Sequence, residues 1–310
     1  MMELITDVAE ITAPLNNAVL TIGNFDGVHL GHQALFRQVM EKARSINGTS
    51  VVMTFEPHPI RVLNCGKNFR LITLYEQKVE LIAATGIDTL ICVPFTRAFA
   101  ATPARAFVKD ILCDVIGMKG VVVGQDYSFG KKREGNIALL KDMGRTYGFE
   151  VIVSGWVEAG PRRISSTEVR NLVAEGQMAE ARQLLGRYYQ VRGTVIRGRD
   201  RGGRLLGFPT ANLRLTDELC PKGGVYTVTV EVEDKTYEGV ANIGYSPTFD
   251  NGEFSIEVHI LDFDQNIYDQ PIRVNFIHRL RGEKRFSGPE ALATQINKDI
   301  THAREILSRP

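Results

Sequence analysis

The hydrophobic positions of this chain follow two different patterns, and the change falls near residue 187. The first part contains five short apolar runs, nearly continuous and rich in β-branched residues, at residues 18–23, 50–55, 88–95, 120–124 and 150–156. Continuous runs of this length are typical of parallel strands that are covered on both faces. Stretches with helical periodicity lie between them, at residues 33–45, 74–85, 103–116 and 136–147. This alternation predicts a doubly wound α/β domain with a parallel sheet.

The second part alternates apolar and polar positions instead. Between residues 226 and 232, Tyr and Val side chains alternate with Thr and Glu, which is the period of an antiparallel strand with one polar face. An Asp-Asn-Gly sequence at residues 250–252 predicts a hairpin turn, and residues 255–260 and 272–277 predict two further strands. The second part is therefore expected to form a small antiparallel barrel or sandwich.

A helix is predicted at the end of the chain, where Pro289 suits a first helical turn. Its apolar positions form one stripe, at Leu292, Ile296, Ile300, Ala303 and Leu307. We expect this stripe to pack against the barrel, and the alternative is a helix that binds a partner. The length of 310 residues suits two domains, which we place at residues 1–186 and 187–310.

Composition limits the kinds of partner. Lys and Arg number 37 and Asp and Glu 36, whereas proteins dedicated to nucleic acids or anionic membranes usually carry a basic excess. No apolar run approaches the roughly 18–20 residues that span a bilayer, and the acidic first segment does not resemble a secretory signal. The four cysteines form no C-x-x-C pair, so we expect reduced thiols, no structural metal and a cytoplasmic location.

The first candidate site follows the first strand. The chain runs from Gly23 into a glycine-rich turn, GNFDGVHLGH, and then into a helix. A helix start offers free N–H groups to a phosphate, and His29 and His32 share one face if the first turn is helical. Two imidazoles there can donate hydrogen bonds to phosphoryl oxygens as negative charge develops. The alternative is a glycine-rich turn with two incidental histidines.

The second candidate is the segment from Ile164 to Arg170, with the sequence ISSTEVR. Ser165 and Glu168 fit a capping box, which starts a helix. Such a start would also present N–H groups and hydroxyls to the β- and γ-phosphates of a nucleotide, with Arg170 one turn further along. The capping role holds in either case, so the sequence leaves the phosphate role open.

These strings resemble a known family. H-x-G-H and I-S-S-T-x-x-R look like the motifs of the HxGH nucleotidyltransferases, and GNFDGVHLGH, TFEPHP and GQDYSFG are similar to the FMN adenylyltransferase branch. The resemblance implies that an FMN phosphate oxygen attacks the α-phosphorus of ATP. It implies catalytic roles for His29 and His32, and ATP contacts for Gly23, Asn24, Phe25, Gly31, Ser165, Ser166, Thr167 and Arg170. It also implies that His58 and Asp126 lie on the flavin side, although a stiff Pro-His-Pro turn is the alternative for His58.

The second part holds a different set of candidate residues, and the chain contains no P-loop of the form G-x-x-x-x-G-K-[ST]. Residues 197–204 hold four arginines among glycines, which favours a mobile loop over an anionic ligand. Thr210 and Asn212 alternate with Ala211, so their side chains share one side of an extended segment and can hold magnesium and ATP oxygens. Glu257 lies on the polar face of its strand, where a carboxylate can accept a proton from a substrate hydroxyl. Each has an alternative: a solvated loop for the arginines, an ordinary loop-to-strand segment for Thr210 and Asn212, and a solvent-exposed acid for Glu257.

Here too the sequence carries a resemblance. GRLLGFPTAN, GVYTV, GVANIGYSPTF, EVHILDFDQNIY and FIHRLRGEKRF look like riboflavin kinase, whose fold is a six-stranded antiparallel barrel. The resemblance implies that Gly207, Pro209, Thr210 and Asn212 bind ATP and Mg²⁺, with Thr210 and Asn212 as metal ligands. It implies that Glu257 is the base that activates the ribityl 5′-hydroxyl.

The two signatures together, in this order, resemble the prokaryotic bifunctional riboflavin kinase/FAD synthetase family over roughly residues 15–305. The family implies that the C-terminal barrel phosphorylates riboflavin to FMN and that the N-terminal domain adenylylates FMN to FAD and pyrophosphate. ATP is then the co-substrate and Mg²⁺ the cofactor. Riboflavin, FMN, FAD and ATP are the expected partners, with no nucleic acid and no membrane, and the sequence predicts no oligomeric state. Two alternatives stay open: an enzyme with one active half, and a flavin- or RNA-binding regulator that uses the arginine-rich loop.

Overall fold

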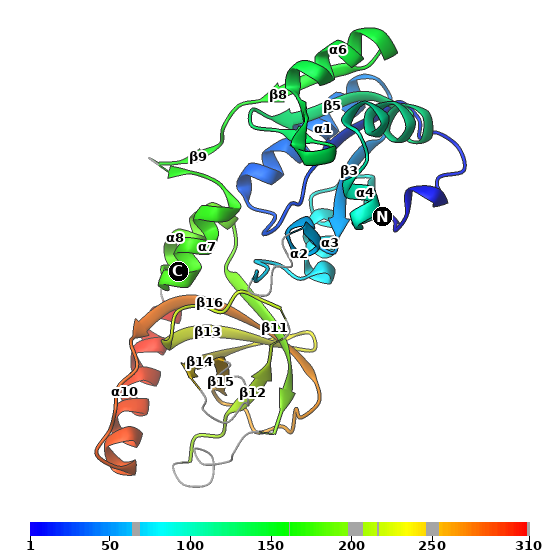
Figure 1. Cartoon of the computed structure of the whole chain (residues 1–310). Helices are drawn as coiled ribbons and strands as arrows, with labels where there is room; N and C mark the ends of the chain where they lie inside the picture. Colours follow the sequence, from blue (N-terminus) through cyan, green and yellow to red (C-terminus); the bar gives the residue numbers. More distant parts are fainter. Residues whose placement is uncertain (64–68, 161, 198–206, 216, 246–253, 309–310) are drawn as a thin grey trace. The chain divides into compact units, whose positions relative to one another are not determined.

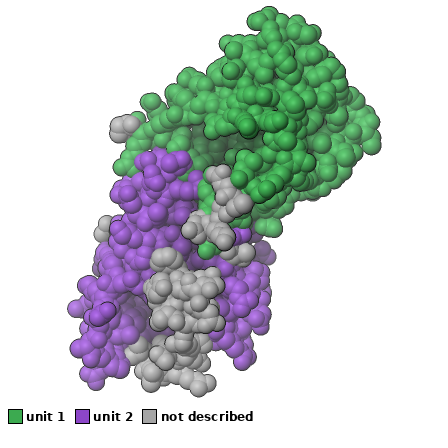
Figure 2. Space-filling model, in the orientation of Figure 1, with its two compact units in different colours: residues 1–166 green, residues 167–310 purple. Residues whose placement is uncertain are grey.

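The computed structural model describes residues 1–63, 69–160, 162–197, 207–215, 217–245 and 254–308. The chain packs into two compact units, residues 1–166 and 167–310 (Figure 2). The second unit includes helix α7 (Ser166–Glu175), apart from its first residue, and helix α8 (Met178–Leu185). The domain boundary predicted from the sequence, at 186/187, assigns both helices to the first domain instead. Within the described residues, no helix combines the length and the hydrophobicity that a membrane crossing requires.

The first unit is built on a six-stranded sheet (Figure 1). In spatial order its strands are β1 (Glu3–Ile5), β4 (Thr89–Pro94), β3 (Ser50–Glu56), β2 (Ala18–Ile22), β5 (Met118–Gly124) and β8 (Glu150–Ser154). Every neighbouring pair is parallel, which confirms the predicted α/β sheet. The five predicted strands are all present. The sixth, β1, has three residues, too few to give a period, and the sequence analysis missed it.

Both faces of this sheet are covered, as the continuous apolar runs predicted. Successive residues of one strand enter different hydrophobic clusters: Val19 packs in one and Leu20 in the other, and the same holds for Val52 and Val51. The helices of the unit are α1 (Leu30–Ser45), α2 (Pro59–Leu63), α3 (Tyr75–Ala83), α4 (Arg97–Ala100), α5 (Ala104–Ala106) and α6 (Ile137–Tyr147). The single helix predicted at residues 103–116 is α5 followed by a π-helical segment, η2 (Phe107–Val115), which the spacing of apolar residues did not distinguish.

Short elements complete the first unit: η1 (Val8–Glu10), β6 (Ser128–Phe129), η3 (Lys131–Arg133), β7 (Gly135–Asn136), β9 (Glu158–Ala159) and β10 (Arg162–Arg163). Strands β6 and β7 pair with each other, and so do β9 and β10, both antiparallel. The two hairpins follow β5 and β8, so they lie in the segments that leave the carboxyl ends of these strands.

The second unit contains a closed six-stranded antiparallel barrel, which decides between the predicted barrel and sandwich. Around the barrel the strands are β11 (Tyr189–Ile196), β12 (Ala211–Arg214), β15 (Phe254–Ile260), β14 (Lys235–Tyr245), β13 (Gly224–Val232) and β16 (Pro271–Arg281). The predicted Asp-Asn-Gly turn and most of the arginine-rich loop lie outside the described residues, but β14 and β15 pair antiparallel, as a hairpin requires.

The terminal helix, α10 (Pro289–Leu307), packs on the barrel as predicted. Ala303 is fully buried and forms a cluster with Val225 of β13 and Val240 of β14. The same cover explains Thr227, which pairs with Val240 across the two strands and is 0 % exposed. The alternation of residues 226–232 predicted that Thr227 lies on a solvent-exposed polar face. That prediction is wrong at Thr227, because a helix distant in sequence covers this side chain.

Candidate active sites

The strand order of the first unit marks a ligand crevice. From β2 the chain builds β3 and β4 on one side and later builds β5 and β8 on the other. In such sheets ligands bind outside the carboxyl ends of the strands, at the point where the order reverses. That point lies between β2 and β5. It is flanked by the loop after β2, which carries His29, and the loop after β5, which carries Asp126.

His29 and His32 lie together at the start of α1. His29 precedes the first helical residue, and its Nδ1 accepts a hydrogen bond from the backbone N–H of His32 at 3.3 Å. The two imidazole rings stack, with their centroids 3.5 Å apart and their planes at 20°. His29 is buried and His32 is half-buried. The structure thus confirms that the two imidazole rings lie side by side at the start of a helix.

Glycine and phenylalanine residues shape the loop around this pair. A Cβ on Gly31 would lie 3.1 Å from Cε1 and Nδ1 of His29, and a Cβ on Gly23 would lie 3.0 Å from the Phe25 ring. Larger residues would therefore push these rings out of place. Phe25 is buried, and its ring meets the His32 ring edge-on at 5.1 Å. The Phe25 side chain supports His32. A contact between Phe25 and ATP would therefore come from the Phe25 backbone.

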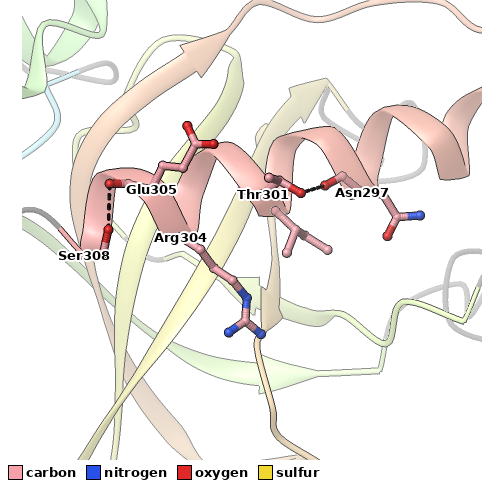
Figure 3. A pocket seen from close by; sticks show the side chains of 6 residues that line it. Asn297, Thr301, Arg304, Glu305 and Ser308 are labelled. Atoms are coloured by element: carbon pink, nitrogen blue, oxygen red, sulfur yellow. Dashed lines mark hydrogen bonds between the residues drawn. The ribbon is translucent and has the colours of Figure 1, made fainter.

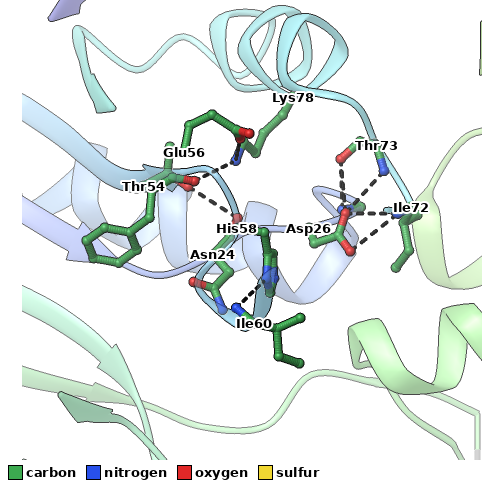
Figure 4. Close-up of polar contacts among 11 residues, drawn as sticks. Asn24, Asp26, Thr54, Glu56, His58, Ile60, Ile72, Thr73 and Lys78 are labelled. Atoms are coloured by element: carbon green, nitrogen blue, oxygen red, sulfur yellow. Dashed lines mark hydrogen bonds and ion pairs between the residues drawn. The ribbon is translucent and has the colours of Figure 1, made fainter. Parts of the chain in front are cut away.

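Asp26 ties this loop to a second segment, and the sequence analysis missed it. Its buried carboxylate accepts hydrogen bonds from the backbone N–H groups of Ile72 and Thr73 at 3.0 and 3.1 Å (Figure 4). The Thr73 hydroxyl in turn accepts a hydrogen bond from the N–H of Gly27 at 3.1 Å, and the Asp26 carbonyl accepts one from the Ser166 hydroxyl at 2.9 Å. A buried carboxylate needs such donors, so Asp26 acts as a positioning residue for the histidine loop.

The end of β3 adjoins the same loop (Figure 4). The Thr54 hydroxyl donates to the carbonyl of Asn24 at 3.2 Å, and the Asn24 side chain is exposed. His58 is buried, its Nδ1 accepts the N–H of Ile60 at 3.3 Å, and its ring lies 4.7 Å from that of Phe69. The structural role that the sequence offered as the alternative for His58 is therefore present, and its flavin contact stays a prediction.

Lys78 is a buried cation at this strand end, and it too was missed from the sequence. Its side chain is 5 % exposed. Its Nζ donates to the Phe55 carbonyl at 3.4 Å and lies 3.7 Å from Oε2 of Glu56. Burial raises the pKa of Glu56, and the charges of Lys78 and Arg61 oppose that rise. The ion pair holds the last residues of β3, directly before the turn that carries His58.

Helix α7 begins at Ser166, with Ser165 directly before it, where the capping motif predicted a helix start. A Cβ on Gly31 would lie 3.6 Å from the Ile164 carbonyl, so this segment approaches the histidine loop. Thr167 is exposed and Arg170 is half-buried. Both belong to the second unit, and their contacts with a triphosphate stay a prediction.

Asp126 is exposed in the loop after β5, where it forms an ion pair with Arg163 at 2.9 Å. A row of aromatic rings, with successive centroids 5.5–6.1 Å apart, begins next to it, and the sequence analysis missed this row. Its members are Tyr127, Phe129, Phe107, Phe99, Phe95 and Phe55. Phe107 and Phe129 are buried in the hydrophobic core and the other four rings are half-buried. The row therefore packs the elements of this unit together, and only its half-buried rings are accessible to a planar ligand. Burial raises the pKa of Tyr127, so its phenol stays neutral.

In the barrel, Glu257 lies between two asparagines of neighbouring strands. It is opposite Asn212 on β12 and opposite Asn242 on β14, and directly paired residues of a sheet share a face. Its neighbours Ile256 and Val258 are fully buried in the opposite direction. Glu257 itself is half-buried, and burial raises its pKa. A raised pKa makes a carboxylate a stronger base, so the alternative of an ordinary exposed acid does not hold. Asn242 was missed from the sequence.

Thr210 and Asn212 lie on the accessible side of their segment. The side chain between them, Ala211, is 9 % exposed, so the two polar side chains point the other way. Both are half-buried. A hydroxyl and an amide oxygen are ligands that Mg²⁺ accepts together with water and phosphate oxygens, so this donor set fits the implied ion.

The chain before Thr210 is fixed from β15. Nδ1 of His259 lies 2.7 Å from the Pro209 carbonyl, and the His259 ring meets the Phe208 ring edge-on at 5.6 Å. Gly207 is exposed and has φ of +75°, the left-handed region that favours glycine. His259 thus positions the segment that carries the predicted ATP and metal ligands.

A shallow hollow of about 470 Å³ lies elsewhere, along α10 (Figure 3). Its lining comes from one face of that helix: Asn297, Ile300, Thr301, Arg304, Glu305 and Ser308. None of these residues belongs to a predicted site, and Arg304 is paired with Asp262 at 2.8 Å. We assign it no role in the chemistry.

Comparisons with known proteins agree with this two-part geometry. The sequence model of the FAD synthetase family matches residues 11–168, and that of riboflavin kinase matches residues 185–307. The chain is 40 % identical to the bifunctional riboflavin kinase/FMN adenylyltransferase of Escherichia coli K12 over 313 residues, covering 100 % of both chains. It is 42 % identical to the protein of the same name from Listeria monocytogenes, covering 94 % of this chain and 93 % of that one.

One solved structure is similar over nearly the whole chain. It is described as a macrolide-efflux protein from Streptococcus pneumoniae, and it is 33 % identical to this chain. The similarity covers 98 % of both chains with a TM-score of 0.88.

Proposed function

This chain belongs to the family of bifunctional riboflavin kinase/FMN adenylyltransferases, and from that premise we propose how its two parts divide the work. The barrel domain, residues 187–310, transfers the γ-phosphate of ATP to riboflavin and gives FMN and ADP. The N-terminal domain, residues 1–186, transfers AMP from a second ATP to FMN and gives FAD and pyrophosphate. Riboflavin, FMN, FAD and ATP are thus its small-molecule partners.

In the N-terminal domain, an FMN phosphate oxygen bonds to the α-phosphorus of ATP, and the bond from that phosphorus to pyrophosphate breaks. His29 and His32 donate hydrogen bonds to the phosphoryl oxygens as charge develops on them. Their place at the start of α1 supports this role, because the N–H groups and the dipole of a helix start favour negative charge. Positioning and charge stabilisation carry the step, so it needs no side-chain nucleophile.

The remaining contacts follow the two sides of the crevice. We assign ATP contacts to Gly23, Asn24, Phe25, Gly31, Ser165, Ser166, Thr167 and Arg170. The exposed side chain of Asn24 and the approach of Ile164 to Gly31 support that set. We assign flavin contacts to Asp126, to His58 and to the half-buried rings of the aromatic row, whose faces suit an isoalloxazine.

In the barrel, Glu257 accepts the proton of the ribityl 5′-hydroxyl, and the oxygen of that group bonds to the γ-phosphorus of ATP while the bond from that phosphorus to ADP breaks. Thr210 and Asn212 hold Mg²⁺, and Gly207 and Pro209 contact ATP. When bound, the ion offsets the negative charge of the transferring phosphate. The position of Glu257 directly opposite Asn212 supports this assignment, because it places the base beside the metal ligands.

We place this synthesis in the cytoplasm. Cys92 and Cys113 are free cysteines, and free thiols suit a reducing compartment.

The observation that carries the proposal is the presence, in one chain, of the stacked histidine pair at the switch crevice and of the shielded carboxylate of Glu257. The test is to incubate the full chain with riboflavin, ATP and Mg²⁺ and to separate the products by chromatography. We expect FMN and then FAD. FMN without FAD would indicate one active half, and RNA binding without ATP consumption would indicate the regulator.

Two variants locate the activities. His32→Ala lowers FAD formation and spares FMN formation, whereas Glu257→Ala does the reverse when FMN is supplied directly. Unchanged FAD synthesis in the His32 variant would remove the assignment of adenylyl transfer to this site.

A further inference from the structure

The ladder between β12 and β15 stops one residue short of the predicted ligand Thr210. The two strands are neighbours in the barrel (Figure 1), and the pair at the end of their ladder joins Ala211 to Val258. One step further, the same register would place Thr210 opposite His259. The residue before Thr210 is Pro209, and a proline has no N–H group with which to extend a ladder. The backbone before Ala211 therefore leaves the sheet, although it carries a residue that the proposed reaction needs in a fixed position.

The side chain of His259 holds this segment where the ladder no longer does. Its Nδ1 lies 2.7 Å from the Pro209 carbonyl oxygen. A carbonyl oxygen only accepts hydrogen bonds, so Nδ1 carries a proton and is the donor. The imidazole also meets the Phe208 ring edge-on, with the centroids 5.6 Å apart and the planes at 90°. Two contacts from one side chain thus fix the residues directly before Thr210.

The two proposed metal ligands differ in how they are held. Asn212 is paired on both sides, with Ile196 of β11 and with Glu257 of β15. Thr210 precedes β12, so its position depends on the contacts of the segment that leads to it. His259 lies two residues after Glu257, and alternate residues of a strand share one face. The same face of β15 therefore presents the proposed base and the side chain that holds the segment of Thr210.

We propose that His259 is a positioning residue of the kinase, which sets the affinity for ATP and Mg²⁺ by holding Thr210 in place. This inference rests on the proposed function of the barrel. In this role His259 acts through the backbone of Pro209 and moves no proton in the reaction. A segment that is free to move is competent to bind in only part of its conformations, which lowers the apparent affinity. Proton transfer to Glu257 does not pass through the segment, so the chemical step changes less than binding does.

The first test measures FMN formation by the full chain at varied concentrations of ATP and Mg²⁺. In His259→Ala, the KM for ATP and the Mg²⁺ concentration that gives the half-maximal rate rise about three- to tenfold, the effect of losing one neutral hydrogen bond. The kcat and the KM for riboflavin stay within about twofold of wild type, whereas a general loss of structure would change them as well. The KM for ATP in FAD formation from supplied FMN is an internal control and stays unchanged, because that reaction is assigned to the other domain.

Two replacements separate the hydrogen bond from the packing of the ring. His259→Asn keeps an N–H donor near the position of Nδ1 without the ring, and it recovers most of the affinity for ATP and Mg²⁺. His259→Phe keeps a ring against Phe208 without a donor, and it behaves like His259→Ala. A matched control is His302→Ala, which removes an exposed histidine of α10 and leaves all constants at wild-type values. Wild-type affinity in His259→Phe and a loss in His259→Asn would overturn the role of the hydrogen bond.

Calorimetry supplies a readout apart from turnover. The full chain is titrated with a non-hydrolysable ATP analogue in the presence of Mg²⁺, and we expect two binding sites in wild type. In His259→Ala one site weakens by the same factor as the KM for ATP in FMN formation, and the other keeps its wild-type affinity. His259→Asn restores the first site. Equal weakening of both sites would overturn the inference.

The outcomes separate the two hypotheses. If the wild-type chain forms no FMN, the proposed function of the barrel is wrong and the inference falls with it. If wild type forms FMN and His259→Ala keeps the wild-type affinity for ATP and Mg²⁺, or loses kcat alone, the role of His259 is wrong and the proposed function stands.

Discussion

Nδ1 of His29 accepts a hydrogen bond from the backbone N–H of His32, so one imidazole both caps α1 and stacks on its neighbour. A capping side chain satisfies one of the N–H groups that a helix start leaves without an intrahelical partner. An alanine at position 29 therefore removes a helix cap as well as an imidazole, and a loss of activity in that variant has two explanations.

A variant that keeps the cap separates the two roles. We predict that His29→Asn retains the stability of α1, because asparagine is among the preferred N-cap residues, and that it still loses FAD synthesis. His29→Ala loses FAD synthesis and also lowers the free energy of unfolding by about 1 kcal/mol. Denaturant titration and product chromatography measure the two effects. Wild-type FAD formation by His29→Asn would show that the imidazole takes no part in the reaction.

Glu257 offers a prediction in which activity and stability change in opposite directions. Burial raises the pKa of this carboxyl above that of an exposed glutamate, so the folded chain binds this proton more tightly than the unfolded chain does. The stability that the protonated group contributes is lost as the pH rises through the folded pKa. Glu257→Gln therefore abolishes FMN formation but raises the melting temperature of the barrel at neutral pH.

The gain from Glu257→Gln should disappear below about pH 4.5, where the carboxyl is protonated in the folded and unfolded chain alike. Calorimetry across this pH range measures it. The control is Glu238→Gln, an exposed acid on the neighbouring strand β14, for which we expect no gain. A lower melting temperature for Glu257→Gln at neutral pH would show that the ionised carboxylate stabilises the barrel.

The sequence predicted those parts of the fold that depend on residues close together in the chain. Runs such as 50–55 are continuous because successive side chains enter clusters on both faces of the sheet, and this alone identifies a covered parallel strand. Thr227 shows the limit of such patterns. It lies on the polar face of its own strand, and its burial comes from a helix whose packing the pattern of β13 does not contain.

The same limit applies to the sites. The histidines and Glu257 belong to recognisable strings. The structure places the histidines together at a helix start and Glu257 opposite Asn212, and their roles in the chemistry stay predictions. Asp26 is part of one such string, yet its role depends on N–H groups 47 residues away at Thr73. Lys78 and Arg163 act on partners from other elements, Glu56 and Asp126. Positioning residues of this kind are defined by contacts between elements, so the spacing of residues within one element does not reveal them.

The Lys78–Glu56 pair leads to a prediction about pH. Lys78→Met removes the buried ammonium and leaves Glu56 without its main counter-charge, so the pKa of Glu56 rises further. A carboxyl with a raised pKa loses its stabilising contribution as the pH increases. The variant should therefore melt roughly 3–6 °C below wild type at about pH 8, and the difference should be smaller at about pH 5.

A second substitution isolates the cause. In Lys78→Met combined with Glu56→Gln, no carboxyl titrates at this position, and the difference from wild type should no longer grow with pH. Melting curves of the three proteins at both pH values supply the measurement. An equal loss for Lys78→Met at both values would mean that Lys78 acts through its contact with the Phe55 carbonyl and not through Glu56.

The last prediction concerns the buried ion pair that joins α10 to the barrel. Nε and Nη2 of Arg281 on β16 donate to Oδ1 and Oδ2 of Asp299 at 3.0 and 2.7 Å, and their side chains are 14 % and 7 % exposed. Removing one partner leaves the other charge buried, so Asp299→Asn should lower the free energy of unfolding of the barrel by about 3–5 kcal/mol.

Replacing both partners removes both buried charges. We therefore expect Arg281→Met with Asp299→Leu to be more stable than Asp299→Asn alone, as a double-mutant cycle by denaturant unfolding would measure. The control is Asp262→Asn, because Asp262 pairs at 2.8 Å with Arg304 of the same helix but is 76 % exposed. Its loss should cost no more than about 1 kcal/mol. If the double variant proves no more stable than Asp299→Asn, the loss of stability in Asp299→Asn comes from poorer packing of α10 and not from an uncompensated buried charge.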